Sequence, residues 1–309
     1  MKKLLAMDYE MTRKVTTNAF MPCEIAQQSS HAMESNGYPL KGMPIYDGEI
    51  HRFHVKGDKK GTLNGWYVLF LAPIPAAVYG SWKTNEKFNW YAVQKNQLTE
   101  AEQGEYQYLL ESVRQQQKEK RHQEQQCVAD ESTAFFLQLP HDVQHMPYMV
   151  RKEVNGYGLG RSNQLIVVPI RDIDGNITSL QFISPNGSKW FQRGGRVSGC
   201  FHLIGVIADI LYICEGYATG ATIHQETGLP VAVAFFADNL KPVAIAIRKQ
   251  YPNLHIIIAA DNDRFTPGNP GISKGREAAN STGASLVYPV FPKGQAGTDF
   301  NDLALLERT

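Results

Sequence analysis

One stretch of the chain has the pattern of a buried strand that ends in a carboxylate and turns at once into a helix. Residues 211–214 are all apolar, which is typical of a strand covered on both faces in a parallel sheet. Glu215 follows directly, and Gly216 lets the backbone turn without a Cβ clash. Small residues at 218–221 allow the next helix to start close against the sheet. The stretch therefore predicts an α/β sheet with Glu215 at its carboxyl edge.

A second apolar run, at 255–260, ends in Asp261-Asn262-Asp263. Ligands of open α/β sheets bind beyond the carboxyl ends of the strands, so Glu215, Asp261 and Asp263 converge there if the two strands are neighbours. Alternate residues of an extended segment point the same way, so the two aspartates can share one ligand. Hard oxygen ligands grouped in this way suit Mg²⁺ or Mn²⁺. Taken singly, each acid also has a structural explanation, as a capping or ion-paired carboxylate or as turn chemistry.

Strands alternate with helices along the same part of the chain, which indicates a mostly parallel sheet with helices on its faces. The expected strands lie at 211–214, 231–235, 255–260 and 285–288, and the expected helices start near 217, 240, 272 and 300.

These residues resemble the Toprim domain of bacterial-type primases, topoisomerases and some nucleases, which pairs a Glu-Gly strand end with a later Asp-x-Asp. The spelling Glu-Gly-Tyr-Ala-Thr at 215–219 is similar to the motif of plasmid-borne and phage primases of the conjugative-plasmid and satellite-phage type. The similarity continues in order through 228–235, 239–240, 268–271 with Lys274, and 298–302.

The resemblance implies a DNA primase, a nucleotidyltransferase that makes short RNA primers from ribonucleoside triphosphates on a single-stranded DNA template. It implies plasmid or phage replication, Mg²⁺ or Mn²⁺ as cofactor, and a separately encoded helicase as a further partner. Asp261 and Asp263 would hold metal, and Glu215 would share a metal or act as general base. Asp299 would add a further acid, although it also fits a helix start. Thr219 stands where such primases often carry an acid, so the number of metals stays open.

Lys274 is a further catalytic candidate, because a cation in the first turn of a helix opposes the helix dipole and is explained by a phosphate. An ordinary surface lysine fits the position as well.

Composition narrows the class of protein. The chain has 309 residues, enough for two domains, and a net charge of +1, so a nucleic acid would have to meet a local basic surface. Its cysteines form no Cys-x-x-Cys pair, which favours reduced thiols and a cytoplasmic location. The N-terminus meets Asp8 and Glu10 before any apolar core of a signal peptide, and no run approaches a membrane span. We therefore expect a cytoplasmic protein without a membrane partner.

Changes in sequence pattern predict four parts: a β-rich domain at 1–95, a helical connector at 96–130, a mixed α+β primase-core subdomain at 131–208 and the Toprim domain at 209–309. Residues 1–40 show only weak helical spacing. The connector is rich in Gln, Glu and Lys, with Thr99 as its expected cap and an apolar stripe only at its start. That stripe comprises Tyr106, Leu109, Leu110 and Val113.

Short alternating stretches separated by Gly and Pro at 45–91 predict an antiparallel sheet. Its aromatic residues beside basic ones can form a platform for single-stranded nucleic acid, with Trp66, Trp82, Lys59 and Lys60 as the candidates. The alternative is that the rings fill a small core and the lysines keep it soluble.

In the primase-core part, 164–171 and 177–184 predict a hairpin with its turn at Asp174-Gly175, and Asn186-Gly187 predicts a second turn. Arg193 and Arg196 flank paired glycines, which lets guanidinium groups and backbone amides approach a phosphate. A plain surface turn explains the same residues. The resemblance favours a basic surface that guides template, to which Lys189 would belong.

Two departures from the family leave rival functions open. The sequence contains neither a zinc ribbon nor a Gly-x-x-x-x-Gly-Lys-Ser/Thr loop. The rivals are a Toprim nuclease, in which water replaces the ribose hydroxyl, and a non-catalytic DNA-binding accessory protein, against which the acids at all three positions argue.

Overall fold

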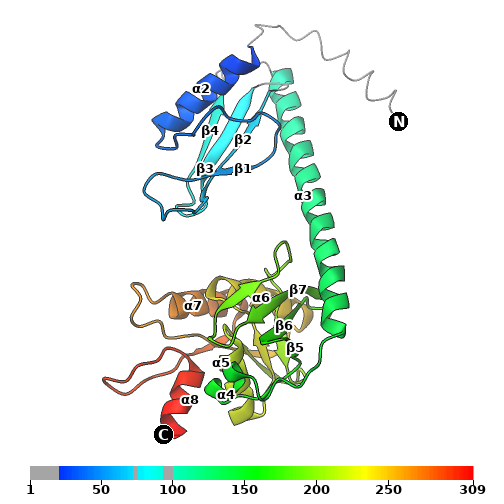
Figure 1. Ribbon diagram of the computed structural model, residues 1–309, viewed down its shortest axis with the longest axis vertical. Helices are drawn as coiled ribbons and strands as arrows, with labels where there is room; N and C mark the ends of the chain where they lie inside the picture. The colour runs from blue at the N-terminus through cyan, green and yellow to red at the C-terminus, as the bar shows by residue number, and fades with distance from the viewer. Residues whose placement is uncertain (1–20, 72–74, 93–99, 309) are drawn as a thin grey trace. The chain divides into compact units, whose positions relative to one another are not determined.

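A computed structural model describes residues 21–71, 75–92 and 100–308 (Figure 1). The chain divides between Lys118 and Glu119 into two compact units. This division falls inside the long helix α3, Glu100–Leu137. The helix continues to Leu137, past residue 130, where the sequence pattern predicts the end of the connector. Thr99 lies outside the described residues, as do the side chains of the stripe Tyr106, Leu109, Leu110 and Val113.

Besides the first part of α3, the described residues of the N-terminal unit form a helix and an antiparallel sheet. The sheet runs in the order β1-β2-β3-β4, each strand paired with the next in sequence. Its strands are β1 His51–Phe53, β2 Gly65–Phe70, β3 Ala76–Ser81 and β4 Lys87–Tyr91. This confirms the antiparallel sheet predicted from the alternating pattern.

Helix α2, Pro22–Ser35, has no counterpart among the elements expected from the sequence. Pro22 occupies the first helical position, where its missing N–H is not needed, and the amide of Met21 donates to the Glu24 carboxylate at 3.0 Å. Ile25 and Met33 on one side of the helix pack with Leu69 and Tyr79 of the sheet. The helix is therefore stabilised by tertiary packing rather than by a strong periodic pattern.

After the end of α3, the C-terminal unit contains the short helix α4, Pro147–Lys152, and a second antiparallel sheet. Gly175 and Gly187 adopt φ values of 88° and 89° at the two predicted turns, a conformation that glycine adopts without strain. The predicted hairpin and the second turn are thus confirmed. The strands are β5 Gly160–Ser162, β6 Leu165–Arg171, β7 Ile177–Ile183 and β8 Lys189–Phe191.

The third sheet has the order β13-β12-β10-β11-β9 and is parallel except for its edge strand β9. This confirms the mostly parallel sheet predicted for the end of the chain. The strands are β9 His202–Ile204, β10 Ile210–Cys214, β11 Val231–Val233, β12 His255–Ala259 and β13 Ser285–Val287. The helices are α5 Tyr217–Thr227, α6 Ala237–Gln250, α7 Pro270–Thr282 and α8 Phe300–Arg308.

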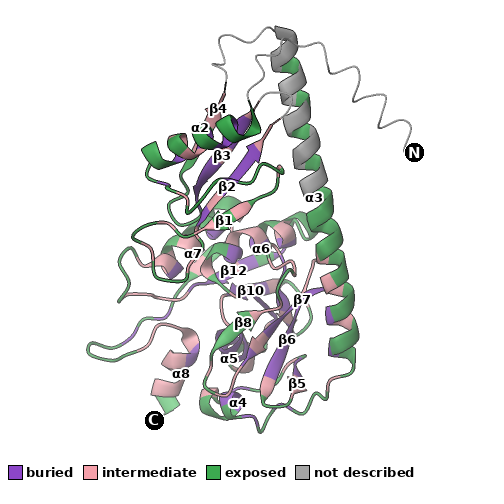
Figure 2. Cartoon of the chain, turned by 45° about the horizontal axis from the view of Figure 1, so that its top comes forward, coloured by how far each residue is buried: buried purple, intermediate pink, exposed green. Residues whose placement is uncertain are grey.

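Helices cover both faces of this sheet, and its central strands are buried (Figure 2). Tyr217 and Ala221 of α5 pack on one face, while Leu240 and Val243 of α6 pack on the other. A Cβ on Gly220 would lie 2.8 Å from a methyl group of Val233, so α5 needs glycine there to lie close to the sheet. The close packing brings the start of α5 directly to the carboxyl end of β10.

A membrane span can be checked only in the described part of the chain. There, each helix is either too short or too polar to cross a bilayer.

Candidate active site

Two acidic side chains meet at the carboxyl edge of the parallel sheet. Strands β10 and β12 pair directly, with Cys214 opposite Ala259, so Glu215 and Asp261 follow neighbouring strand ends. Glu215 Oε1 and Asp261 Oδ1 are both buried, and neither has a hydrogen-bond partner among the residues that the structure describes. We call these two residues the buried acid pair. Buried polar atoms are normally satisfied, so this arrangement indicates a site for a ligand that neutralises the carboxylates.

The electrostatics of the buried acid pair follow from burial and from neighbouring negative charges. Burial, together with the Asp263 charge, raises the pKa of Glu215 to about 7, although the backbone amide of Asp261 acts in the opposite direction. Burial and the charge of Glu215 raise the pKa of Asp261 to about 8, against the lowering effect of Lys189. Near neutral pH the pair therefore holds a proton that a bound cation would displace.

Asp263 lies on the same loop but has a structural partner. Its Oδ2 accepts a hydrogen bond from the backbone amide of Gly271 at 3.0 Å, in the first turn of α7. Asn262 points elsewhere, because its amide donates to the carbonyl of Thr298 at 2.7 Å and its side chain to that of Pro289 at 3.0 Å. Asp263 thus combines a helix-capping contact with a charge that acts on Glu215.

The acids do not form a closed metal cluster. Within residues 21–71, 75–92 and 100–308, no group of three His, Cys, Asp or Glu side chains is arranged to hold a metal ion. The donor set nevertheless fits a hard divalent cation, because the two buried oxygens are carboxylate oxygens in need of positive charge. Such a cation takes few protein ligands and keeps several waters.

The surroundings of Asp299 fit both roles that the sequence suggests, a further acid of the site and the start of a helix. Its Oδ1 accepts from the backbone amide of Asp302 at 2.8 Å, the contact expected of a residue that caps α8. Its charge also raises the pKa of Asp261 and of Glu215.

A cavity of about 270 Å³ opens beside these acids. We call it the basic pocket, because three of its lining residues are cationic. Its lining consists of Tyr148, Arg151, Lys152, Asn186, Gly187, Lys189, Gly216, Ala218, Thr219 and Asp299. The N-terminus of α5, at Gly216 to Thr219, therefore faces the same space as the cations, and a helix N-terminus favours anions.

The charge of Lys189 acts on the buried acid pair, because it lowers the pKa of Asp261. The residue as a whole is exposed, but a Cβ on Gly216 would lie 3.7 Å from its Nζ, and its Nζ is 5.9 Å from the centre of the Tyr148 ring. Burial of the ammonium end lowers the pKa of Lys189, and the charge of Asp299 partly opposes this effect. The lysine thus links the basic pocket to the acid edge.

Tyr148 forms the floor of the pocket. It is 3% exposed, and its hydroxyl has no hydrogen-bond partner in the described part of the chain. Burial raises the pKa of this hydroxyl, so it remains a hydrogen-bond donor. A buried donor without an acceptor is suited to an anionic ligand.

The two other cations are held by α4 and its surroundings. Arg151 donates from Nη1 to the carbonyl of Pro185 at 2.8 Å, and Lys152 pairs with Asp302 at 3.1 Å. Asn301 donates to the carbonyl of Lys152 at 2.7 Å and to Oγ1 of Thr222 at 2.9 Å.

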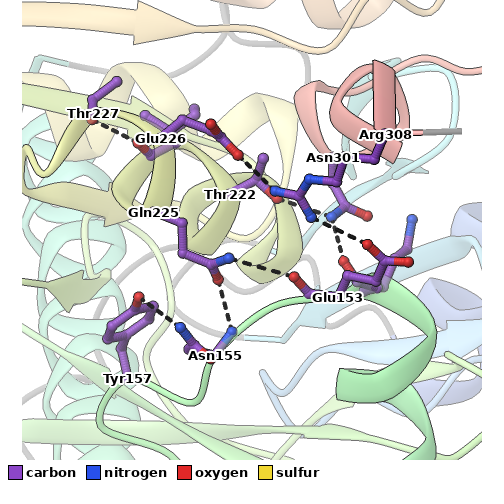
Figure 3. Close-up of polar contacts among 11 residues, drawn as sticks. Glu153, Asn155, Tyr157, Thr222, Gln225, Glu226, Thr227, Asn301 and Arg308 are labelled. Carbon is purple, nitrogen blue, oxygen red and sulfur yellow. Dashed lines mark hydrogen bonds and ion pairs between the residues drawn. The ribbon is translucent and has the colours of Figure 1, made fainter. Parts of the chain in front are cut away.

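A wider polar network ties the end of α4 to α5 and α8 (Figure 3). The amide of Asn155 donates to Gln225 at 2.8 Å, and Arg308 pairs with Glu153 at 3.3 Å and with Glu226 at 2.6 Å. The network fixes the elements that carry Lys152 and the start of α5. Sequence reasoning missed Tyr148, Arg151 and Lys152, although the run Tyr-Met-Val-Arg-Lys was visible; only the fold brings it beside Gly216.

Other predicted site residues lie elsewhere. Arg196 pairs with Asp172 at 3.0 Å, whereas Arg193 is exposed. Lys274 pairs with Asp238 at 2.9 Å and with Glu277 at 3.6 Å. These carboxylates offer a second explanation for a cation at the start of α7, beside the phosphate contact expected from the sequence.

The aromatic candidates of the N-terminal unit form a pair. The rings of Trp66 and Trp82 lie 5.2 Å apart at 30°, and Trp82 is 52% exposed. Lys59 and Lys60 are exposed on the loop between β1 and β2. Trp90, by contrast, packs against the core of this unit. Trp82 is exposed and Trp66 is partly buried, and a ring pair with one exposed member is compatible with stacking on bases.

Comparison with known proteins identifies the C-terminal part of the chain. Residues 210–308 match the family model of the Toprim domain. The chain is 32% identical over 264 residues to a DNA primase TraC of Escherichia coli, covering 82% of this chain and 25% of that protein. A second DNA primase TraC of Escherichia coli is also 32% identical over 264 residues, covering 80% of this chain and 18% of that protein. The chain thus spans a quarter or less of the curated relatives it matches.

The chain also shows a partial structural similarity to solved primase structures. The primase fragment of the bacteriophage T7 primase-helicase protein is 18% identical and covers 52% of this chain and 65% of its own, with a TM-score of 0.38. The DnaG primase catalytic domain bound to ssDNA is 14% identical and covers 60% of this chain and 78% of its own, with a TM-score of 0.41. The resemblance to Toprim-domain primases found in the sequence is confirmed by the family model and the curated relatives.

Proposed function

Because residues 210–308 match the Toprim domain, we propose that this chain carries the catalytic core of a DNA primase. It makes short RNA primers from ribonucleoside triphosphates on single-stranded DNA, in plasmid or phage replication. The observation that carries the proposal is the placement of the buried acid pair beside the basic pocket. Acids that attract a cation and a pocket that attracts phosphate are the two requirements of nucleotidyl transfer.

In this mechanism Glu215 and Asp261 hold a divalent cation, with Asp263 and Asp299 adding negative charge. We propose Mg²⁺ or Mn²⁺, since the donors are hard oxygens. When bound, the ion supplies activation of a ribose hydroxyl and stabilisation of charge at the α-phosphate. Glu215, with a pKa of about 7, has the alternative role of accepting the hydroxyl proton, because a general base works best when its pKa is near the working pH.

The basic pocket supplies the matching phosphate site. Arg151, Lys152 and Lys189 neutralise the phosphate oxygens, and the first amides of α5 add donors. The Tyr148 hydroxyl donates a further hydrogen bond. Fixing the nucleotide from several sides converts the reaction into an effectively unimolecular step.

Template handling belongs to other surfaces of the chain. We propose that Arg193 and the Trp66 and Trp82 pair, with Lys59 and Lys60, contact single-stranded DNA through its phosphates and bases. A separately encoded helicase is the further partner that this function requires, and the cytoplasm is its place of action.

A Toprim nuclease is the second candidate, since the buried acid pair also suits attack by water. The test incubates the chain with single-stranded DNA, labelled ribonucleotides and Mg²⁺ or Mn²⁺, and scores both new primers and cleaved DNA. Primers without cleavage support the proposal; cleavage without primers supports the nuclease. Glu215→Gln and Asp261→Asn should abolish the activity.

Asp174→Asn is the matched control, because Asp174 is exposed in a hairpin turn where asparagine is equally suitable. It should retain full activity. Equal loss in the control and the site variants would show that the chemistry does not depend on the buried acid pair.

A further inference from the structure

Strand β8 presents two different faces. Lys189 and Phe191 are alternate residues of this strand, so their side chains leave it on the same side. Trp190 leaves on the opposite side, where its ring stacks on Phe182 at 5.8 Å and 20°. The face with Lys189 and Phe191 is turned toward the parallel sheet, since Lys189 reaches Gly216.

Phe191 meets two aromatic residues at the end of β11. Its ring centre lies 5.9 Å from that of Phe235 at 88°, and 6.0 Å from that of Phe236 at 67°. We call Phe191, Phe235 and Phe236 the aromatic cluster. Lys189 and Phe191 are therefore neighbours on one face of β8, and Phe191 joins Lys189 to the two phenylalanines that follow β11.

The aromatic cluster lies at the same sheet edge as the acids. Strand β11 pairs in parallel with β10, and the amide of Ala234 donates to the carbonyl of Cys214 at 2.7 Å. Phe235 follows Ala234 and Glu215 follows Cys214, so both leave the sheet at one level. Strand β12 flanks β10 on the other side. Along this sheet edge, Asp261 and Asp263 therefore lie on one side of Glu215 and the aromatic cluster lies on the other.

The backbone of Phe235 is unusual. Its φ is 75°, in the left-handed region that bulky residues rarely adopt and that favours glycine. Strained backbone of this kind persists only when surrounding structure enforces it, and it concentrates at functional sites. Phe236, the next residue, is 38% exposed, so part of its ring is accessible at this edge.

We propose that the aromatic cluster stacks on a nucleobase whose phosphate is held by Lys189. This rests on the proposed function, because it deepens the same site. Alternate residues of a strand are about 7 Å apart, a separation comparable to that of phosphate and base within one nucleotide. Base stacking on an aromatic ring tolerates any base, which suits an enzyme that copies varied templates.

The proposal can be tested by adding two 2-aminopurine probes, one at a time, to the 309-residue protein and measuring their fluorescence. One probe is 2-aminopurine riboside triphosphate and the other is single-stranded DNA containing one 2-aminopurine, whose fluorescence falls when the base stacks. Phe236→Leu should reduce the fall and weaken binding about tenfold, while Phe236→Tyr should restore both. The probe that responds identifies the base as that of the ribonucleotide or of the DNA.

Two further variants separate stacking from folding. Phe235→Gly removes the ring at a position whose φ suits glycine, so relief of the backbone strain offsets part of the packing lost against the core. The variant should remain folded by circular dichroism and still reduce the fall in fluorescence. Trp190→Leu, on the other face of β8, should leave the fall unchanged. The proposal is overturned if neither probe responds to the parent protein, or if Phe236→Leu and Phe235→Gly respond as the parent does.

The readout does not depend on catalysis. A parent that quenches a probe but makes no primer would sink the proposed function and leave the stacking site standing. If the parent makes primers while Phe236→Leu and Phe235→Gly quench the probes as the parent does, the stacking site is overturned and the proposed function stands.

Discussion

Glu215 and Asp261 end neighbouring parallel strands, and each leaves one buried carboxylate oxygen without a hydrogen-bond partner among the described residues. Burial is the main reason why both pKa values lie near or above neutrality, at about 7 and about 8, and the charge of Glu215 adds to the rise at Asp261. If the buried acid pair bound no ligand, neutral side chains at these two positions would make the protein more stable. The arrangement therefore links stability, pH and cation binding in ways that can be measured.

Asp261→Asn should leave the metal-free protein as stable as the parent or slightly more stable, because it removes a buried carboxyl that repels Glu215. Mn²⁺ that binds only the folded state should raise the melting temperature of the parent progressively with its concentration. The variant should show a smaller rise and at least a hundredfold less primer synthesis, roughly the loss seen on removing one electrostatic catalytic group. Thermal melts in EDTA and across a Mn²⁺ series measure the first two effects. A normal Mn²⁺ response in the variant would exclude Asp261 as a ligand.

The stability of the metal-free protein should fall as pH rises from about 5 to about 8. Glu215 and Asp261 have folded-state pKa values above their ordinary values of 4.5 and 3.8, so between these limits the folded state binds more protons than the unfolded state. Raising the pH removes those protons and stabilises the unfolded state relative to the folded one. Asp261→Asn should flatten this dependence, which melts in EDTA at several pH values would reveal. An equally steep profile in the variant would assign the slope to other groups.

Asp263 should behave differently from Asp261, because its carboxylate accepts from the amide of Gly271 at the start of α7. Asp263→Ala should lower the free energy of unfolding by about 1 kcal/mol, the usual loss of a helix cap. Asp263→Asn keeps an acceptor and should lose less, while both variants lose primer synthesis if the charge serves the site. Urea denaturation of the two variants gives the comparison. Full activity in Asp263→Asn would make Asp263 purely structural.

The parallel sheet and its acidic edge could be predicted because buried strands of this type are short apolar runs, and ligands gather at their carboxyl ends. The aromatic cluster could not be predicted, because no pattern in the sequence indicates a φ of 75° at Phe235. Nor could the basic pocket, because Tyr148 and Gly216 are far apart in the chain and only packing makes them neighbours. Helix α2 was missed for a related reason: it packs through a few residues such as Ile25 and Met33 rather than through a strong periodic stripe.

Substitutions of Arg193 and Arg196 should have different effects, although the sequence analysis gives both residues the same role. Arg193 is exposed, whereas the guanidinium of Arg196 pairs with Asp172. Arg193→Ala should weaken binding to single-stranded DNA and reduce the slope of log affinity against log salt by about 0.7, the contribution of one phosphate contact. Arg196→Ala should mainly change stability. Fluorescence anisotropy over a range of salt concentrations measures the slopes, and an unchanged slope for Arg193→Ala would reduce its loop to a plain turn.

Lys189 and Lys274 are the two candidates for the cation that binds the phosphate of the nucleotide. Lys189 lines the basic pocket, while Lys274 pairs with Asp238 and Glu277. Lys189→Met keeps the apolar stem and removes the charge, so it should raise KM for ribonucleotides at least about tenfold, the value of one charge-assisted hydrogen bond. Steady-state primer synthesis with Lys189→Met, Lys274→Met and the exposed Lys249→Met as control measures the difference. A rise confined to Lys274→Met would return the phosphate site to the start of α7, where the sequence first predicted it, and would leave the basic pocket without a part in nucleotide binding.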